Sequence, residues 1–212
     1  MLNLPSSTEF GRRVPKQKFY EHLDVSPEVK RLFIDQIKLI TWANKLSPQT
    51  MNLGAGQTVT EIEVFHIRLT GRELDKRTLE LMDRQIPYHI LFVLERPDGQ
   101  MQLRISYKEA SQSGDNAFRL RQSYATEFAP PESLTLPLDA LDMDSLYASI
   151  VRAIAGDALS APEQPLEQAV AQAQEKEKLQ RQITQLKAKM KKEKNLGKQM
   201  ELRRAIRRLE DG

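Results

Sequence analysis

The sequence contains no cysteine, which excludes disulfide bonds, thiolate metal sites and cysteine nucleophiles, and suits a reducing compartment. No apolar run approaches the roughly 20 residues that a membrane-spanning helix needs, and the N-terminus lacks the apolar core of a secretory signal. Aromatic residues are scarce and charged residues abundant, yet apolar residues are plentiful up to about Gly156. We expect a soluble, cytoplasmic protein with no membrane partner.

Motifs of well-known enzyme classes are missing as well. The chain has three histidines and no Gly-x-Ser-x-Gly sequence, which disfavours Ser-His-Asp chemistry. Gly54-Ala55-Gly56 lacks both the third glycine of a dinucleotide-binding loop and the Gly-Lys-Ser/Thr of a P-loop, so a plain turn is favoured over a phosphate cradle. With no catalytic signature, a non-enzymatic role without a cofactor is favoured.

The net charge of +3 conceals an asymmetry along the chain. Residues 1–166 hold 19 Lys and Arg against 22 Asp and Glu, whereas the chain from Glu167 onward holds 13 against 7. A chain of 212 residues has room for one domain of roughly 100 to 200 residues plus an appendage. We therefore expect an α+β domain over residues 1–156, a linker over 157–165 and a basic helical arm over 166–212.

A predicted β-hairpin organises the domain. Residues 90–94 form an unbroken apolar run, which is typical of a strand covered on both faces. Pro97-Asp98-Gly99 predicts a reversal, and residues 101–107 then alternate between apolar and polar side chains. The other expected elements are strands over residues 58–69 and 118–128 and helices over residues 26–47, 74–86 and 142–156. The domain is thus expected to be a mixed sheet of about four to five strands packed by helices.

The helix expected over residues 26–47 has a strong start signal. Ser26 is a good N-cap, Pro27 suits the first helical position, and Glu28 faces the positive end of the helix dipole. Apolar residues then recur at helical spacing until Ser47-Pro48 ends the pattern.

The arm carries a narrow apolar seam at four-three-four spacing, which is typical of helix pairing. The members of this seam are Leu179, Ile183, Leu186 and Met190. Asn195-Leu196-Gly197 interrupts the pattern, so the arm is either one helix with a stutter, as in a coiled coil, or an antiparallel helical hairpin. In either form, the seam is suited to a partner helix or to a second copy of the chain.

Basic side chains crowd the same arm. Taken together with the seam, this charge first favours pairing with a protein helix. Salt-sensitive, sequence-independent binding to DNA or RNA is the second hypothesis, and a plain solvated helix face is the third. The basic cluster consists of Lys187, Lys189, Lys191, Lys192, Lys194, Lys198, Arg203, Arg204, Arg207 and Arg208.

A second set of residues suggests metal chemistry. Glu61, Glu63 and His66 lie on one predicted strand, and a spacing of two puts both carboxylates on the same face. His89 and Glu95 flank the next strand, so a cluster of carboxylates and imidazoles across the two strands is a hypothesis. Such ligands suit Mg²⁺, Mn²⁺ or Zn²⁺, although a solvated face and structural histidines are the simpler interpretation. A metal-dependent nuclease could add Lys108, yet Ser106 stands where its Glu-x-Lys motif requires an acid.

Several segments resemble a known family over nearly the whole chain. They are Pro15-Lys16 with Phe19-Tyr20-Glu21, Trp42 with Lys45-Leu46-Ser47-Pro48, Thr60-Glu61-Ile62-Glu63-Val64-Phe65, Ile86-Pro87-Tyr88-His89-Ile90-Leu91-Phe92, and Lys192-Glu193-Lys194 with Glu201-Leu202. The chain resembles bacterial domain-of-unknown-function family 4391. The resemblance implies genes beside chromatin-remodeller-like helicases and DNA methyltransferases, in islands similar to restriction or phage-defence loci. It supplies no catalytic residues.

These observations give a leading hypothesis and two alternatives. The protein is expected to be a non-enzymatic accessory component that binds a helicase or methyltransferase of the same locus. The α+β domain would dock a protein partner, and the arm would either pair with a partner helix or contact the backbone of DNA. The alternatives are a metal-dependent nuclease using Glu61 and Glu63, for which alone a divalent cofactor is expected, and a scaffold that self-assembles through the arm.

Overall fold

The computed structural model describes residues 2–21, 25–110, 118–159 and 163–210. The chain divides into two compact units, a body over Met1–Ser160 and an arm over Ala161–Gly212. Of the predicted linker, residues 160–162 lie outside the described residues, while Gly156–Leu159 form a 3-10 helix in which Leu159 is buried.

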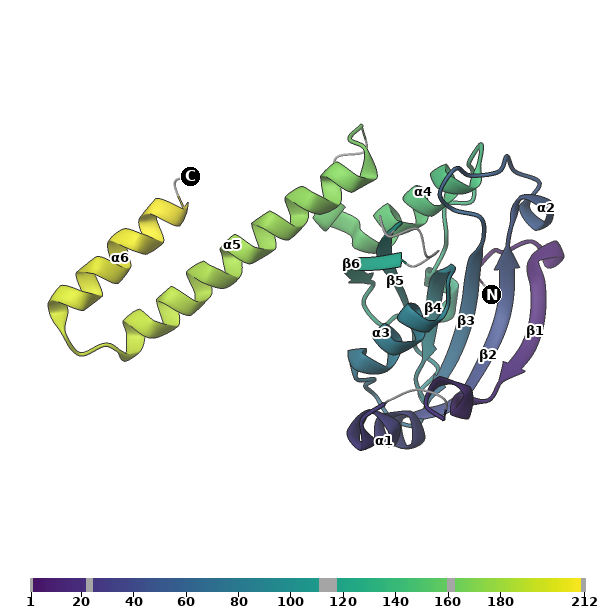
Figure 1. The fold of residues 1–212 in the computed structure, drawn as a ribbon, viewed down its shortest axis with the longest axis horizontal. Coiled ribbons are helices and arrows are strands. Elements are labelled where there is room, and N and C mark those ends of the chain that lie inside the picture. The colour runs from purple at the N-terminus through teal and green to yellow at the C-terminus, as the bar shows by residue number, and fades with distance from the viewer. Residues whose placement is uncertain (1, 22–24, 111–117, 160–162, 211–212) are drawn as a thin grey trace. The chain divides into compact units, whose positions relative to one another are not determined.

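The body is built on one six-stranded sheet whose strand order is the order of the strands in the chain. The strands are β1 Glu9–Val14, β2 Ile37–Leu46, β3 Ile62–Leu69, β4 His89–Glu95, β5 Met101–Ala110 and β6 Phe118–Ala125. All neighbours are antiparallel except β3 and β4, which are parallel and are joined by α3 (Lys76–Gln85). The predicted α+β class and mixed sheet are confirmed (Figure 1), with six strands where four to five were expected; β1 and β2 are the strands that the sequence did not predict.

The helix predicted over residues 26–47 is wrong in its second half. Ser26 does cap a helix, α1 (Pro27–Gln36), by accepting a hydrogen bond from the Val29 N–H, but β2 follows directly. The register of β2 against β3 shifts between Ile37 and Leu39, so Ile37 and Ile40 both reach the core although they stand three residues apart. A β-bulge thus reproduces the spacing of a helix, and strand pairing overrides the local pattern.

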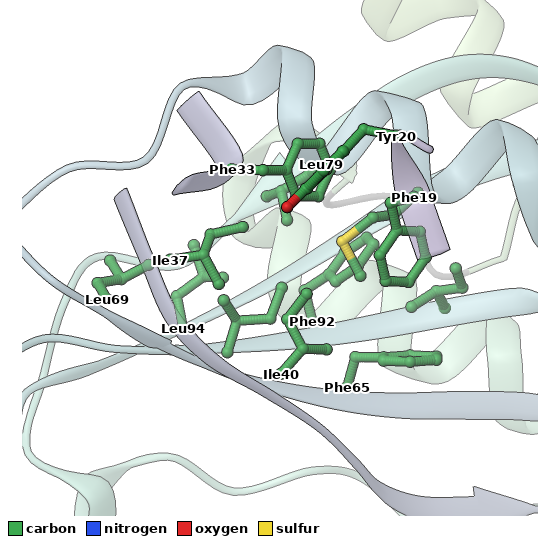
Figure 2. Close-up of a cluster of buried hydrophobic side chains, with 13 residues drawn as sticks. Phe19, Tyr20, Phe33, Ile37, Ile40, Phe65, Leu69, Leu79, Phe92 and Leu94 are labelled. Carbon is green, nitrogen blue, oxygen red and sulfur yellow. The ribbon is translucent and has the colours of Figure 1, made fainter. Parts of the chain in front are cut away.

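The main core lies on the face of the sheet that α1 and α3 cover. Phe33 of α1 is completely buried, and the rings of Phe19 and Tyr20 pack against it with centroids 5.9 and 5.8 Å away. Leu79 and Met82 join from α3. Figure 2 shows how these side chains meet the apolar residues of the central strands.

The opposite face is covered by α4 (Met143–Ala155), which begins at a capping box formed by Asp142 and Ser145. Its Tyr147 ring lies 4.3 Å from the ring of His89, whose neighbour Ile90 points to the main core. Side chains alternate across a strand, so α4 packs on the second face. Short helices complete the body: η1 Ser6–Thr8, η2 Lys16–Phe19, α2 Pro48–Met51 and η3 Pro131–Ser133.

The arm consists of two helices, α5 (Leu166–Lys192) and α6 (Leu196–Glu210). Helix α6 packs on α5 and folds back along it (Figure 1). The arm is therefore a helical hairpin rather than one helix with a stutter. Within the described ranges, neither this pair nor any other helix has the length and apolar content needed to cross a membrane.

Candidate nucleic-acid interface

The apolar seam of α5 has a partner within the arm itself, because α6 packs against α5. Ile183 of α5 and Ile206 of α6 are each about 5% exposed, and the other seam residues are half-buried. Leu202, Ala205 and Leu209 are the half-buried apolar residues of α6. Packing between α5 and α6 therefore uses much of the apolar surface that the sequence assigns to an external partner helix.

The turn between the two helices is held by its own hydrogen bonds. Asn195 caps α6, because its Oδ1 accepts the Lys198 N–H at 3.1 Å. The Glu193 carboxylate accepts the N–H groups of Lys194 and Asn195 at 2.9 and 2.8 Å, and these bonds lower the pKa of Glu193. The sequence around Asn195, interpreted above as an interruption, is thus a helix start.

All ten residues of the basic cluster are exposed. They occupy the last turns of α5, the connecting turn and the length of α6. Lys187 pairs with Glu210 across the hairpin at 2.7 Å, but exposed ion pairs are worth at most about 1 kcal/mol and are exchanged easily for a phosphate. The hairpin therefore presents a cationic surface to solvent.

Two further features lie near the turn. A groove of about 810 Å³ runs between the end of α5 and α6. Its lining contains Lys189, Lys192, Glu193, Lys198, Glu201, Leu202, Ala205 and Arg208. Beyond it, Leu196 and Met200 on the first turns of α6 are 75% and 54% exposed, and we call this pair the apolar tip. Neither feature was predicted from the sequence.

The candidate metal residues of the body lie on different faces of the sheet. Glu63 is 1% exposed and its Oε2 accepts the Trp42 Nε1–H at 2.6 Å. Burial, reinforced by the nearby charge of Glu61, raises the pKa of Glu63 to about 7. Glu61 itself pairs with Lys45.

The two histidines project from the opposite side of β3 and β4. His66 Nε2 lies 2.7 Å from Glu95 Oε2, and burial lowers the pKa of His66. His89 packs between the rings of Phe118 and Tyr147, and burial lowers its pKa to about 4. The histidines therefore do not join the carboxylates, and no group of three or more acidic or histidine side chains in the described ranges could hold a metal ion.

Lys108 is enclosed in the body. Its side chain is 0% exposed, and its Nζ lies 3.1 Å from Asp83 Oδ1 and donates to the backbone carbonyls of Asp83 and Tyr88 at 2.9 and 2.6 Å. Ser106 Oγ donates to the other Asp83 oxygen at 2.6 Å. Lys108 therefore satisfies one carbonyl in the last turn of α3 and one directly before β4, and it ties that helix to β5.

The model of the family described as Domain of unknown function (DUF4391) matches residues 2–212. The chain belongs to the DUF4391 family. No curated protein matches the chain, and no solved structure matches it. The resemblance expected from the sequence is confirmed at the level of the family.

In this DUF4391 protein, the loop at residues 54–59, part of which was predicted to be a plain turn, binds the carboxylate of Asp144. The Asp144 carboxylate, in the first turn of α4, accepts the N–H of Gln57 at 2.7 Å, the Thr58 hydroxyl at 2.9 Å and the N–H of Val59 at 2.8 Å. A Cβ on Gly56 would lie 2.7 Å from Asp144 Oδ1. Burial opposes ionisation, but these hydrogen bonds outweigh it and lower the pKa of Asp144.

The DUF4391 loop is thus a cradle for an internal carboxylate. Consecutive backbone N–H groups that converge on an anion are a familiar phosphate-binding arrangement, but here Asp144 fills it. No local signal pairs residue 57 with a side chain 87 positions later, so sequence patterns could not reveal this role.

Proposed function

We propose that the protein is a non-enzymatic accessory component of a bacterial, DNA-associated helicase and methyltransferase system, and that its helical hairpin binds the phosphate backbone of nucleic acid. One observation carries the proposal: the ten residues of the basic cluster are all exposed. From Lys187 to Glu210 inclusive, the chain has only three acidic residues, Glu193, Glu201 and Glu210. The apolar seam contributes to packing inside the hairpin, so charge dominates the outward chemistry.

The expected binding is electrostatic and independent of sequence. Each phosphate that a Lys or Arg neutralises releases counterions from the nucleic acid, which makes the affinity fall as salt rises. About five phosphate contacts would give a slope near −4.5 in a plot of log K against log salt concentration. Half of the basic cluster would be sufficient for such a slope.

A fluorescence-anisotropy titration of the full-length protein with labelled DNA at 50 and 200 mM salt tests the proposal. The variant Lys191→Gln/Lys192→Gln should bind more weakly than the wild type and show a shallower salt slope. Lys176→Gln/Lys178→Gln is a matched control, because it removes the same charge from exposed positions of the same helix. Equal losses in both variants, or binding insensitive to salt, would count against a phosphate site at the basic cluster.

The apolar tip supports a second candidate function, the docking of a protein partner. Leu196 and Met200 stand one helical turn apart and are both largely exposed, as anchor residues of helix-mediated contacts are. We propose that the helicase or methyltransferase of the same locus covers this pair. Leu196→Ser/Met200→Ser should abolish co-purification with that partner and leave DNA affinity unchanged, and retained co-purification would refute the assignment.

The geometry of the body favours these binding roles over a nuclease. Lys108 is fully buried beside Asp83, so it is not placed to contact a phosphate. His66 and His89 lie on the face of the sheet opposite to that of Glu63.

Self-assembly through the arm would appear as a larger mass in light scattering of the full-length chain, with loss of that mass in the apolar-tip variant.

A further inference from the structure

The groove between α5 and α6 differs from the rest of the basic surface because it combines charge with an apolar floor. Lys189, Lys192, Lys198 and Arg208 line it together with Leu202 and Ala205. A flat basic surface is sufficient to follow the outside of a duplex. A concave site with an apolar floor fits a ligand that is anionic at one end and flat and apolar at the other.

We propose that this groove holds one unpaired nucleotide, so that the hairpin binds single-stranded nucleic acid more tightly than duplex. The inference rests on the proposed function and adds the substrate class to it. The base lies against Leu202 and Ala205, and the flanking phosphates lie among Lys189, Lys192 and Lys198. The volume of the groove, about 810 Å³, falls within the range of small-molecule sites, roughly 300 to 1,000 Å³.

A base can reach this floor only when it is unstacked. In a duplex both faces of each base are covered by its neighbours, whereas single strands offer their base faces to a protein. The described part of the hairpin has no aromatic residue, so the base contacts aliphatic side chains and the Arg208 guanidinium. Such contacts select for an exposed base without selecting which base it is.

The two acidic residues of the lining do not cancel the site. The Glu193 carboxylate is engaged by the N–H groups of Lys194 and Asn195, so its charge faces the turn. Glu201 remains as an exposed hydrogen-bond acceptor at the rim. With four cations against these two carboxylates, the groove keeps a net positive charge.

Anisotropy titrations of the full-length protein with three labelled probes at one salt concentration test the inference. The probes are a twelve-nucleotide deoxythymidine strand, an abasic strand with the same phosphates, and a duplex of equal length. The deoxythymidine strand should bind about fivefold more tightly than the abasic strand, which is the low end for base stacking because the floor is aliphatic. The duplex should bind more weakly than the deoxythymidine strand.

Two variants locate the effect in the groove. Ala205→Leu fills the floor without changing charge or helix propensity greatly and should remove the preference for the deoxythymidine strand over the abasic one. Arg208→Gln should weaken binding to that strand more than Arg204→Gln, which removes the same charge from a position outside the lining. Circular dichroism of each full-length variant checks that its helical content equals that of the wild type.

The outcomes separate the two proposals. Equal affinity of the wild type for the deoxythymidine and abasic strands, with binding still salt-dependent, would overturn the nucleotide site and leave the phosphate interface standing. Equal effects of Arg208→Gln and Arg204→Gln would overturn it in the same way. Failure of the wild type to bind any of the three probes would overturn the proposed function itself.

Discussion

The ammonium group of Lys108 lies 3.1 Å from the carboxylate of Asp83, and the two side chains are 0% and 1% exposed. The pair joins β5 to α3 on the same face as the main core. Water cannot solvate either charge, so Lys108 depends on Asp83 and on the backbone carbonyls of Asp83 and Tyr88, and the Asp83 carboxylate depends on Lys108 and on the Ser106 hydroxyl.

Replacing Lys108 by methionine should destabilise the body strongly. The change leaves Asp83 buried without its counter-charge, which typically costs about 3 to 5 kcal/mol. Urea unfolding monitored by circular dichroism measures the loss. The double variant Lys108→Met/Asp83→Leu should recover part of it, and a Lys108→Met protein as stable as the wild type would contradict the structural role.

The hydrogen bonds to Asp144 should make the free energy of unfolding fall at low pH. The pKa of Asp144 is lowered in the folded protein, so its contribution is present above the pKa of the unfolded chain and disappears as the pH falls through the folded value. Asp144→Asn should cost about 1 to 3 kcal/mol at neutral pH, the usual cost of lost hydrogen bonds to a charged group. The difference between wild type and variant in urea unfolding should shrink at pH 3.

Glycine substitutions test the same loop sterically. Gly56→Ala places a Cβ 2.5 Å from the Val59 carbonyl oxygen, so the loop must move and unfolding should require less urea. Gly71→Ala is the control, because nothing lies within 4 Å of the corresponding Cβ. Equal stability of the two variants would show that the loop tolerates displacement from Asp144.

Glu63 should give the opposite pH dependence. Its pKa is raised to about 7, so the folded state binds the proton more tightly, and stability falls as the pH rises from about 4.5 to 7. Glu63→Gln keeps an acceptor for Trp42 and should gain stability relative to the wild type between pH 5 and pH 8, by at most about 3 kcal/mol.

The fluorescence of Trp42, which is the only tryptophan, reports this titration directly. The wild type should show a transition near pH 7 that Glu63→Gln lacks. Comparing the two proteins isolates Glu63 from His66 and His89, whose lowered pKa values make stability rise with pH. A wild-type profile that is flat between pH 5 and pH 8 would contradict the raised pKa.

Plasmid incubated with the protein and Mg²⁺ or Mn²⁺ should remain uncut. The reason is geometric, because Lys108 is enclosed and the two histidines lie on the face of the sheet opposite to that of Glu63. Glu63→Ala serves as the control for contaminating nuclease. Cleavage by the wild type that disappears in Glu63→Ala would restore the nuclease hypothesis.

Local patterns predicted much of the body, and non-local contacts account for what they missed. The β4–β5 hairpin and the α3 crossover follow from periodicity and turn residues, and both are present. The β2 strand was missed because a bulge gives it helical spacing. The contact between Lys108 and Asp83 and the contact between the Gly56 loop and Asp144 join residues far apart in the chain. No local sequence signal encodes such contacts.

The candidate interface was predicted unevenly for the same reason. Ten basic residues are evident in the sequence, and charge keeps such side chains at the surface. The choice between a hairpin and a continuous helix depended on the caps at Glu193 and Asn195, which are weak signals beside a persistent apolar spacing. The groove could not be predicted from the sequence, because it forms only where α5 and α6 pack together.

The agreement between strand order and chain order has a consequence for biosynthesis. Each strand can pair with its predecessor as it leaves the ribosome, because no later segment has to be threaded between two earlier ones. The loop before β3 is the exception, since its anion arrives only with Asp144. A nascent chain stalled ahead of that residue could form the whole sheet, but the N–H groups of Gln57, Thr58 and Val59 would lack their acceptor until α4 is synthesised.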